Sequence, residues 1–379
     1  MWAYTFHQMR TALILTVLLI AITAPAQWEI QAAPTAADLR GIHALGNGIA
    51  WASGSEGTVL RTTNDGKDWQ RCATPPGAEH LDFRGIQAFD ASTAIVMSSG
   101  KGPLSRLYKT ADGCQTWKLI FTDPDPEGFW DAFRVEIHGN PPQDWGAVLL
   151  GDPVHGRFRL WQEHQGVVDA LPSPPTARKG EAAFAASNSG IFVFDLDYGY
   201  WIATGGVTGS RVIRKVLHGD VELSWGTFPS SPVPVGTHTA SSGIFSIAFA
   251  NIPIEFGNLV GSSGVAVGGD YLKPDDPTNS AAFTADKGKH WLPAQTPPHG
   301  FRSAVAYAAA SKTWITVGPN GTDISTDDGR NWRALRPDPA LGEAADADEH
   351  WNALSLPFVV GPHGRIGRLR VDALHAPAR

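Results

Sequence analysis

Arginine follows an apolar residue at three similar places in this chain. "LRGIHAL" carries Arg40, "FRGIQAF" carries Arg84 and "FRSAVAY" carries Arg302. A guanidinium binds a carboxylate or a phosphate through two parallel hydrogen bonds. If the fold brings these arginines together, they would form a binding site for an anionic ligand.

Other polar and aromatic residues occupy related places, at the starts of comparable segments or in the loops that follow them. They fall in "FWDAF", "GEAAF", "GDPVHGRF" and "GGDY". Aromatic rings offer stacking surface, and carboxylates accept hydrogen bonds. The predicted ligand-binding set comprises Arg40, Arg84, Arg302, Trp130, Asp131, Glu181, Asp152, His155 and Asp270.

The same search finds no complete catalytic set and no sign of a cofactor. The sequence has no glycine-rich dinucleotide turn between a strand and a helix, no Cys-x-x-Cys pair and no haem-attachment motif. We therefore predict no catalytic residue, no cofactor and no metal site formed by histidine or cysteine. The acidic stretches "TDPDPEGFWD" and "LKPDDPTN" could hold calcium or simply be solvated, and both readings stay open.

A polar turn that ends in tryptophan occurs four times, in the frame Ser/Thr-x-Asp-x-Gly-x-x-Trp. The acidic side chain can close the turn on nearby backbone N–H groups, the glycine suits a positive φ, and the tryptophan can pack on a neighbouring sheet. We interpret the turns as structural, and because Cys114 replaces the glycine of the second, we expect that turn to bend differently. The acidic or amide positions are Asn64, Asp112, Asp286 and Asp327, and the tryptophans are Trp69, Trp117, Trp291 and Trp332.

These turns belong to a longer repeat that positions all the residues above. Short strand-like segments, punctuated by glycine and Asn/Asp, recur in the order of three strands, a polar turn and a fourth strand. Seven units of this kind fit the chain; the middle ones keep the strands without the polar turn, and the last lacks its fourth strand. The segment that begins at Trp28 resembles an orphan fourth strand. We therefore predict an all-β, seven-bladed β-propeller of four-stranded blades, closed by the N-terminal strand.

The first 26 residues have the pattern of an export signal. Arg10 precedes the apolar run "TALILTVLLIAIT", and Ala24-Pro25-Ala26 resembles a cleavage site. We expect residues 1–26 to be a signal peptide, residues 27–379 to be a single propeller, and the mature protein to be periplasmic or extracellular without membrane insertion. An uncleaved membrane anchor is the alternative.

The net charge bears on the class of partner, and the two cysteines bear on a possible disulfide. The formal charge of −7 argues against nucleic acid as a partner. Cys72 and Cys114 could pair in an oxidising compartment or remain two buried thiols.

The polar turn resembles the Asp-box, or bacterial neuraminidase repeat, of sialidase-like propellers. The whole arrangement resembles the photosystem II stability and assembly factor family and its secreted bacterial relatives, through the turns and through "GDPVHGRF", "GEAAFAASNSG" and "GVAVGGDY". The assembly factors imply a non-catalytic scaffold for a protein or a peptide. The arginines add a small anionic ligand to the expected partners, and we expect the protein to be a monomer. The sialidases imply the alternative, a carbohydrate-active glycoside hydrolase, although no Arg-Ile-Pro motif and no Tyr–Glu pair for that chemistry is found.

Overall fold

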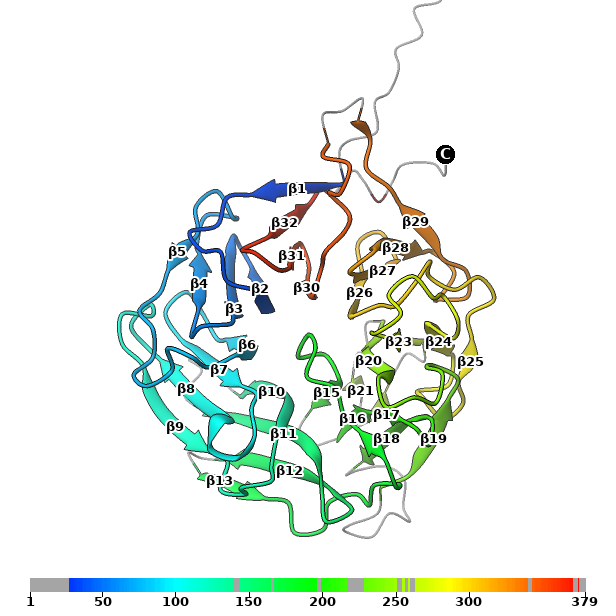
Figure 1. Ribbon diagram of the computed structural model, residues 1–379, viewed down its shortest axis with the longest axis horizontal. Coiled ribbons are helices and arrows are strands. Elements are labelled where there is room, and N and C mark those ends of the chain that lie inside the picture. Colours follow the sequence, from blue (N-terminus) through cyan, green and yellow to red (C-terminus); the bar gives the residue numbers. More distant parts are fainter. Residues whose placement is uncertain are drawn as a thin grey trace, which may run out of the picture.

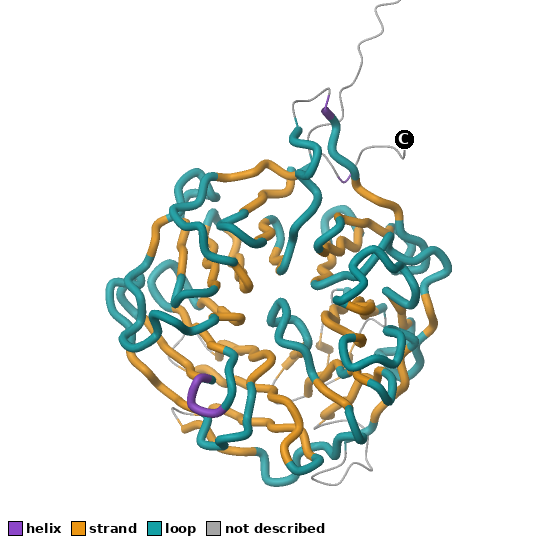
Figure 2. The backbone as a smooth tube through the Cα atoms, viewed as in Figure 1, coloured by secondary structure: helices purple, strands orange, loops and turns teal. Residues whose placement is uncertain are grey.

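The computed structural model describes residues 27–138, 144–164, 167–195, 199–216, 228–250, 254–255, 258–259, 263–339, 343–370 and 374. Antiparallel sheets stand around a central axis as seven blades, so the predicted all-β propeller is confirmed (Figure 1). Strands and loops make up nearly all of the described chain (Figure 2). No helix among these residues is both long and apolar enough to cross a membrane. The predicted signal peptide lies outside the described residues.

Each blade is a meander of four strands that runs from the axis to the rim. Blades 1 and 2 consist of β2 (Leu39–Gly46), β3 (Ile49–Gly54), β4 (Val59–Thr62) and β5 (Gln70–Arg71), then β6 (Phe83–Ala88), β7 (Ala94–Ser98), β8 (Arg106–Thr110) and β9 (Lys118–Thr122). Blades 3 and 4 consist of β10 (Trp130–His138), β11 (Asp144–Val154), β12 (Arg157–His164) and β13 (Val167–Ala170), then β15 (Ile191–Asp195), β16 (Gly199–Ala203), β18 (Ser210–Val216) and β19 (Ser230–Val233).

The second half of the ring repeats this order. Blades 5 and 6 consist of β20 (Ser242–Phe249), β23 (Gly264–Asp270), β24 (Ala281–Thr284) and β25 (Leu292–Pro293), then β26 (Ala304–Ala308), β27 (Thr313–Gly318), β28 (Gly321–Ser325) and β29 (Arg333–Leu335). Blade 7 consists of β30 (Ala353–Ser355), β31 (Phe358–Val360), β32 (Ile366–Leu369) and β1 (Trp28–Gln31). The remaining elements are a 3₁₀ turn η1 (Gly102–Leu104), the short strands β14 (Glu181–Ala182) and β17 (Gly205–Gly206), which extend the sheet of blade 5, and a hairpin of β21 (Ile254–Glu255) and β22 (Asn258–Leu259).

The N-terminal strand closes the ring. β1 pairs antiparallel with β32, with Trp28 opposite Leu369 and Gln31 opposite Ile366. Trp28 is buried, and its indole N–H donates to Thr322 Oγ1 of blade 6 at 3.1 Å. The prediction that the first strand completes the last blade is therefore confirmed.

The hydrophobic core lies between neighbouring blades. One cluster joins Trp51 and Val59 of blade 1 to Phe83, Val96 and Tyr108 of blade 2. Equivalent clusters join the other neighbours, with five tryptophans among the largest fully buried side chains. Because each sheet is covered on both faces, its inner strands are almost continuously apolar.

The four polar turns link the third and fourth strands of blades 1, 2, 5 and 6. In blade 6, Asp327 Oδ1 accepts the Ser325 hydroxyl at 2.8 Å and the Asn331 N–H at 2.9 Å, and the Ser325 hydroxyl oxygen accepts the Gly329 N–H at 3.1 Å. Blades 1, 2 and 5 have the same arrangement around Asn64, Asp112 and Asp286. The four tryptophans are buried and belong to clusters that include the preceding blade.

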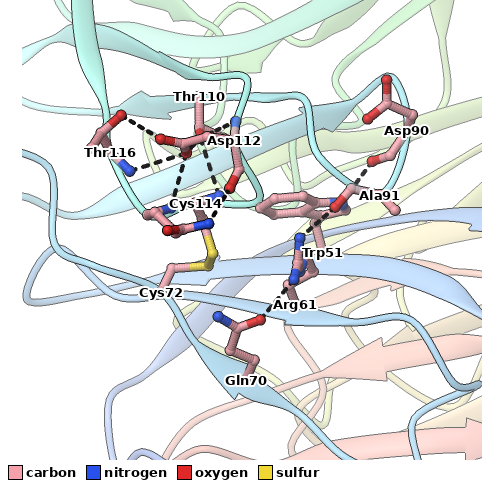
Figure 3. The surroundings of a disulfide bond; sticks show 11 residues. Trp51, Arg61, Gln70, Cys72, Asp90, Ala91, Thr110, Asp112, Cys114 and Thr116 are labelled. Atoms are coloured by element: carbon pink, nitrogen blue, oxygen red, sulfur yellow. Dashed lines mark hydrogen bonds between the residues drawn. A yellow bond between two sulfur atoms is a disulfide. The ribbon is translucent and has the colours of Figure 1, made fainter.

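The expectation of a different turn at Cys114 is wrong. Cys114 adopts φ +65°, close to the +75° and +78° of Gly288 and Gly329, and its N–H donates to the Thr110 hydroxyl as theirs do to the equivalent hydroxyl. A side chain at this position points at the preceding blade, where Cys114 forms a disulfide with Cys72 across a sequence separation of 42 (Figure 3). The disulfide therefore joins blade 1 to blade 2 directly behind the turn.

A loop reaches towards the centre of the ring. Residues 183–190, here called the plug segment, precede β15 and reach towards the axis (Figure 1). Ser187, Asn188 and Ser189 are buried. The segment bonds to four other blades through the pairs Arg84–Ala185, Phe133–Asn188, Ser189–Ser246 and Ser187–Ser303.

Candidate functional site

One end of the axis carries a hollow of about 610 Å³, here called the mouth hollow. The plug segment forms part of its lining, together with the starts of the innermost strands. Its charged members are Arg40, Arg84, Asp131 and Asp152, and its aromatic members are Phe129, Phe184, Phe245, Tyr271 and Phe301. The hollow therefore combines charged groups with an aromatic surface, as ligand sites do.

A β-bulge points side chains into the hollow from four different blades. The pairing of β2 with β3 skips Arg40, because Leu39 lies opposite Gly54 while Gly41 lies opposite Ser53. Arg84, Asp131 and Phe245 are skipped in the same way in blades 2, 3 and 5. An extra residue in one strand bends the strand and redirects its side chain, so the bulges explain why these residues converge.

The two arginines of the hollow are already matched by aspartates. Asp82 lies 2.8 Å from Arg84 Nε and 3.5 Å from Arg40 Nε, and Asp38 lies 3.8 Å from Arg40 NH2. Arg84 also donates to the Ala185 carbonyl of the plug segment at 2.7 Å. Both arginine side chains are about a third exposed; Arg84 is held by hydrogen bonds, whereas Arg40 lies within ion-pair distance of the aspartates and its Nε has no hydrogen-bond partner among the described residues.

The two carboxyls of the hollow lack such a match. Asp131 is 2% exposed, and the structure gives its Oδ2 no hydrogen-bond partner among the described residues. Burial, together with the neighbouring carboxyl of Asp152, raises the pKa of Asp131 well above its usual value, although Arg84 opposes this. Burial also raises the pKa of Asp152 to about 6, although the Ala183 N–H donates to its Oδ1 at 3.1 Å.

Arg302 does not line the hollow, which corrects the predicted arginine triad. In blade 1, Gly54 lies against the carbonyl of Asp38, the residue before Leu39. In blade 6, Gly318 lies in the same way against the carbonyl of Phe301, the residue before Arg302. Arg302 therefore occupies the buried position that Leu39 has in blade 1. Its guanidinium is fully buried, and its Nε donates to Asp323 Oδ2 at 2.8 Å. Ser303 takes the place in the hollow that the sequence assigned to Arg302.

Four other predicted site residues also lie elsewhere. Trp130 is fully buried and stacks on Phe121 with ring centroids 5.5 Å apart. Glu181 lies opposite Gly206 as Leu39 lies opposite Gly54, and its side chain is buried in an ion pair with Arg211 at 2.7 Å.

The remaining two are His155 and Asp270. His155 is exposed in the turn between β11 and β12. Asp270 is buried, accepting the Leu272 N–H and the Thr239 hydroxyl at 3.1 Å each. Of the nine predicted residues, Arg40, Arg84, Asp131 and Asp152 meet in the hollow.

Sequence reasoning missed the plug segment and the aspartates that hold the arginines. The aspartates could have been predicted from the sequence, because "DLRG" and "DFRG" both place Asp two residues before Arg, at Asp38–Arg40 and Asp82–Arg84. The plug segment has no repeat counterpart to align. Among the described residues, no group of three or more His, Cys, Asp and Glu side chains is placed to hold a metal ion, which includes both acidic stretches.

Comparisons with known proteins agree on the fold. No protein-family model matches the chain, and no curated protein matches it. The structure of YCF48 bound to D1 peptide is similar with a TM-score of 0.56 at 15% identity, covering 92% of this chain and 99% of the other. YCF48 from Cyanidioschyzon merolae is similar with a TM-score of 0.55 at 17% identity, covering 91% and 99%.

The WD40 β-propeller domain of Doa1 is also similar, with a TM-score of 0.52 at 10% identity, covering 92% of this chain and 99% of the other. At these identities the likeness shows a shared fold and nothing about a shared ligand.

Proposed function

We propose that this chain is an exported, non-catalytic propeller scaffold that binds a protein or peptide segment in the mouth hollow. The observation that carries the proposal is the hollow itself, where charged groups and aromatic rings from several blades surround one space. A peptide partner is further supported by the similar fold of YCF48, whose structure contains a bound D1 peptide. Peptide recognition needs no reacting groups, only a preformed surface with specific contacts.

Export is supported by the pattern of residues 1–26 and by the Cys72–Cys114 disulfide, because disulfides persist in oxidising compartments. We further propose that the protein is a monomer, since the closed ring leaves no free sheet edge at the join between its first and last strands.

The test is selection of peptides from a random display library on the immobilised full chain, followed by affinity measurements in solution. Tyr271 lines the hollow and is 49% exposed, so Tyr271→Ala should weaken the selected peptides about tenfold or more. Leu292→Ala is the matched control, because Leu292 is an exposed apolar residue on the outer strand of the same blade. Peptides that bind the Tyr271 variant as tightly as the wild type would exclude the hollow as the binding surface.

A second candidate, glycoside hydrolysis, is favoured by one observation. Asp131 and Asp152 line the same hollow, and a carboxyl with a raised pKa can act as a general acid. Turnover of sialosides or aryl glycosides by the wild type, lost in Asp152→Asn, would establish it. Equal background rates for both proteins would reject it.

A further inference from the structure

The acidic side chains around the mouth hollow outnumber the basic ones. Arg40 and Arg84 stand among four aspartates, Asp38, Asp82, Asp131 and Asp152. Asp38 and Asp82 already lie within ion-pair distance of the arginines. The anion-binding capacity that three converging arginines would supply is therefore taken up inside the protein, with Arg302 paired to Asp323.

Unlike Arg40 and Arg84, the carboxyls of Asp131 and Asp152 form no ion pair with the described residues. Asp131 reaches the hollow from the bulge of β10, and its Oδ2 is buried without a partner in the described chain. Asp152 reaches it from β11, with Oδ1 held by the Ala183 N–H of the plug segment. A buried carboxyl without a donor is costly, and the cost disappears when a ligand supplies the donor.

An aromatic surface adjoins Asp152 through Phe184, which follows Ala183 in the chain and stacks on Phe245 with ring centroids 4.1 Å apart. Phe245 packs edge to face on Phe301, with ring centroids 4.7 Å apart, and Tyr271 lies 6.0 Å from Phe245. Aromatic faces attract cations, and they also pack against the methylene stem of a long side chain. A flexible side chain that ends in a positive charge satisfies both surfaces at once.

We propose that Asp131 and Asp152 form a subsite for a positively charged side chain of the partner peptide, either the ammonium of lysine or the guanidinium of arginine. This inference rests on the proposed peptide-binding function and reverses the expectation of an anionic ligand. The plug segment positions Asp152, because the Ala183 N–H donates to it, and the segment also forms part of the wall of the hollow.

The test uses small probes that share one aromatic ring and differ in charge: phenethylamine, phenethylguanidine and hydrocinnamate. Binding to the full chain is followed at pH 7.5 by calorimetry and by the NMR shifts of the Asp131 and Asp152 carboxyl carbons. We expect either or both cations to bind and shift these carbons, with hydrocinnamate at least about tenfold weaker. The stronger of the two cations identifies the side chain.

Variants test the same point independently. The double variant Asp131→Asn/Asp152→Asn should lose about tenfold or more in affinity for the bound cation, with its fold checked by circular dichroism. Asp169→Asn is the matched control, because Asp169 is exposed on the outermost strand of the same blade. If the double variant fails to fold, the carboxyl shifts of the wild type still decide the question.

Three results would overturn the inference. Tighter binding of hydrocinnamate, lost in Arg84→Gln, would show an anion site and leave the proposed peptide-binding function intact. Carboxyl shifts caused by calcium chloride and by neither organic cation would show a metal site. If library peptides bind in the hollow and neither carboxyl carbon shifts, Asp131 and Asp152 do not contact the peptide.

Discussion

At the residue scale, a shift of one position decides what each arginine at a strand start can do. Arg40 and Arg84 sit on bulges and line the hollow, whereas Arg302 lies one place earlier and is buried against Asp323 of its own blade. Successive side chains of a strand point to opposite faces, so this shift moves a charge from the mouth to the core. The buried guanidinium is then tolerated because Asp323 and the Phe301 carbonyl accept its hydrogen bonds.

Asp131→Asn should stabilise the protein at neutral pH. The folded-state pKa of Asp131 is raised, chiefly by burial and by Asp152 with Arg84 opposing, so ionisation favours the unfolded chain as the pH rises above about 4. Asparagine cannot ionise, and we expect a gain of about 1–3 kcal/mol in the free energy of unfolding at pH 7.5. The gain should vanish near pH 3.5, where both states hold the proton. Urea unfolding at the two pH values measures it.

Arg40 and Tyr271 also line the hollow, but the groups whose charges act on the pKa of Asp131 are Asp152, which raises it, and Arg84, which lowers it. A variant that is less stable than the wild type at pH 7.5 would show that the Asp131 carboxylate has a stabilising partner.

Asp327→Ala should destabilise blade 6 without affecting the mouth hollow. The change removes an acceptor for the Ser325 hydroxyl, the Asn331 N–H and the Asn331 side-chain amide, which should cost about 1–3 kcal/mol. Thermal unfolding measures the loss, with Asp328→Asn as control because the side chain of Asp328 is 47% exposed. Loss of peptide binding with unchanged stability would mean that the turn is itself a site.

At the scale of elements, the molecule joins neighbouring blades through the polar turns. The turn glycines face the preceding blade so closely that a side chain at Gly329 would meet Val265 at 2.6 Å. Cys114 stands at the equivalent place in blade 2, where the side chain instead becomes a covalent link to blade 1. The same turn geometry thus allows close packing at Gly329 in blade 6 and a disulfide at Cys114 in blade 2.

Breaking this link should lower stability but keep the turn. The double variant Cys72→Ala/Cys114→Gly restores glycine in the frame, so the turn hydrogen bonds should persist. The disulfide closes a loop of about 42 residues, and its loss should cost about 4 kcal/mol through the larger entropy of the unfolded chain. Denaturant unfolding measures the change, and the wild type treated with reductant under denaturing conditions is the matched comparison. Equal midpoints for oxidised wild type and variant would contradict the expectation.

At the scale of the whole molecule, the ring depends on a join between its two ends. Only β1 completes blade 7, and Trp28 packs near Trp351 with ring centroids 6.0 Å apart. The innermost strands and the plug segment share this closed frame, so the geometry of the hollow depends on a strand that lies at the rim.

A chain without residues 28–34 should therefore be less stable and prone to associate. Its β32 would present unpaired backbone groups at a sheet edge, and such edges pair with other chains. Differential scanning calorimetry should show a lower Tm, and light scattering should show oligomers that the parent chain does not form. Trp28→Ala, which keeps the strand but removes its buried ring, should lower the Tm without causing association.

The sequence by itself determined the architecture of this protein. Strand period, glycine placement and the four polar turns are local features that repeat along the chain, and counting them predicted seven blades and their closure through Trp28. It also predicted four members of the hollow, Arg40, Arg84, Asp131 and Asp152, because repeat positions that align in sequence lie at equivalent places around the axis.

Only the tertiary structure decided the chemistry of the hollow. A bulge in the strand, and a shift of one residue in its pairing, decide whether an arginine faces the axis. Aspartates close to the guanidinium decide whether its charge is already paired within the protein. The plug segment has no counterpart in other repeats, and its partners lie in blades far apart in sequence. Burial and pairing are properties of neighbours in space, which is why the predicted anion site became a hollow whose unmatched groups are carboxyls.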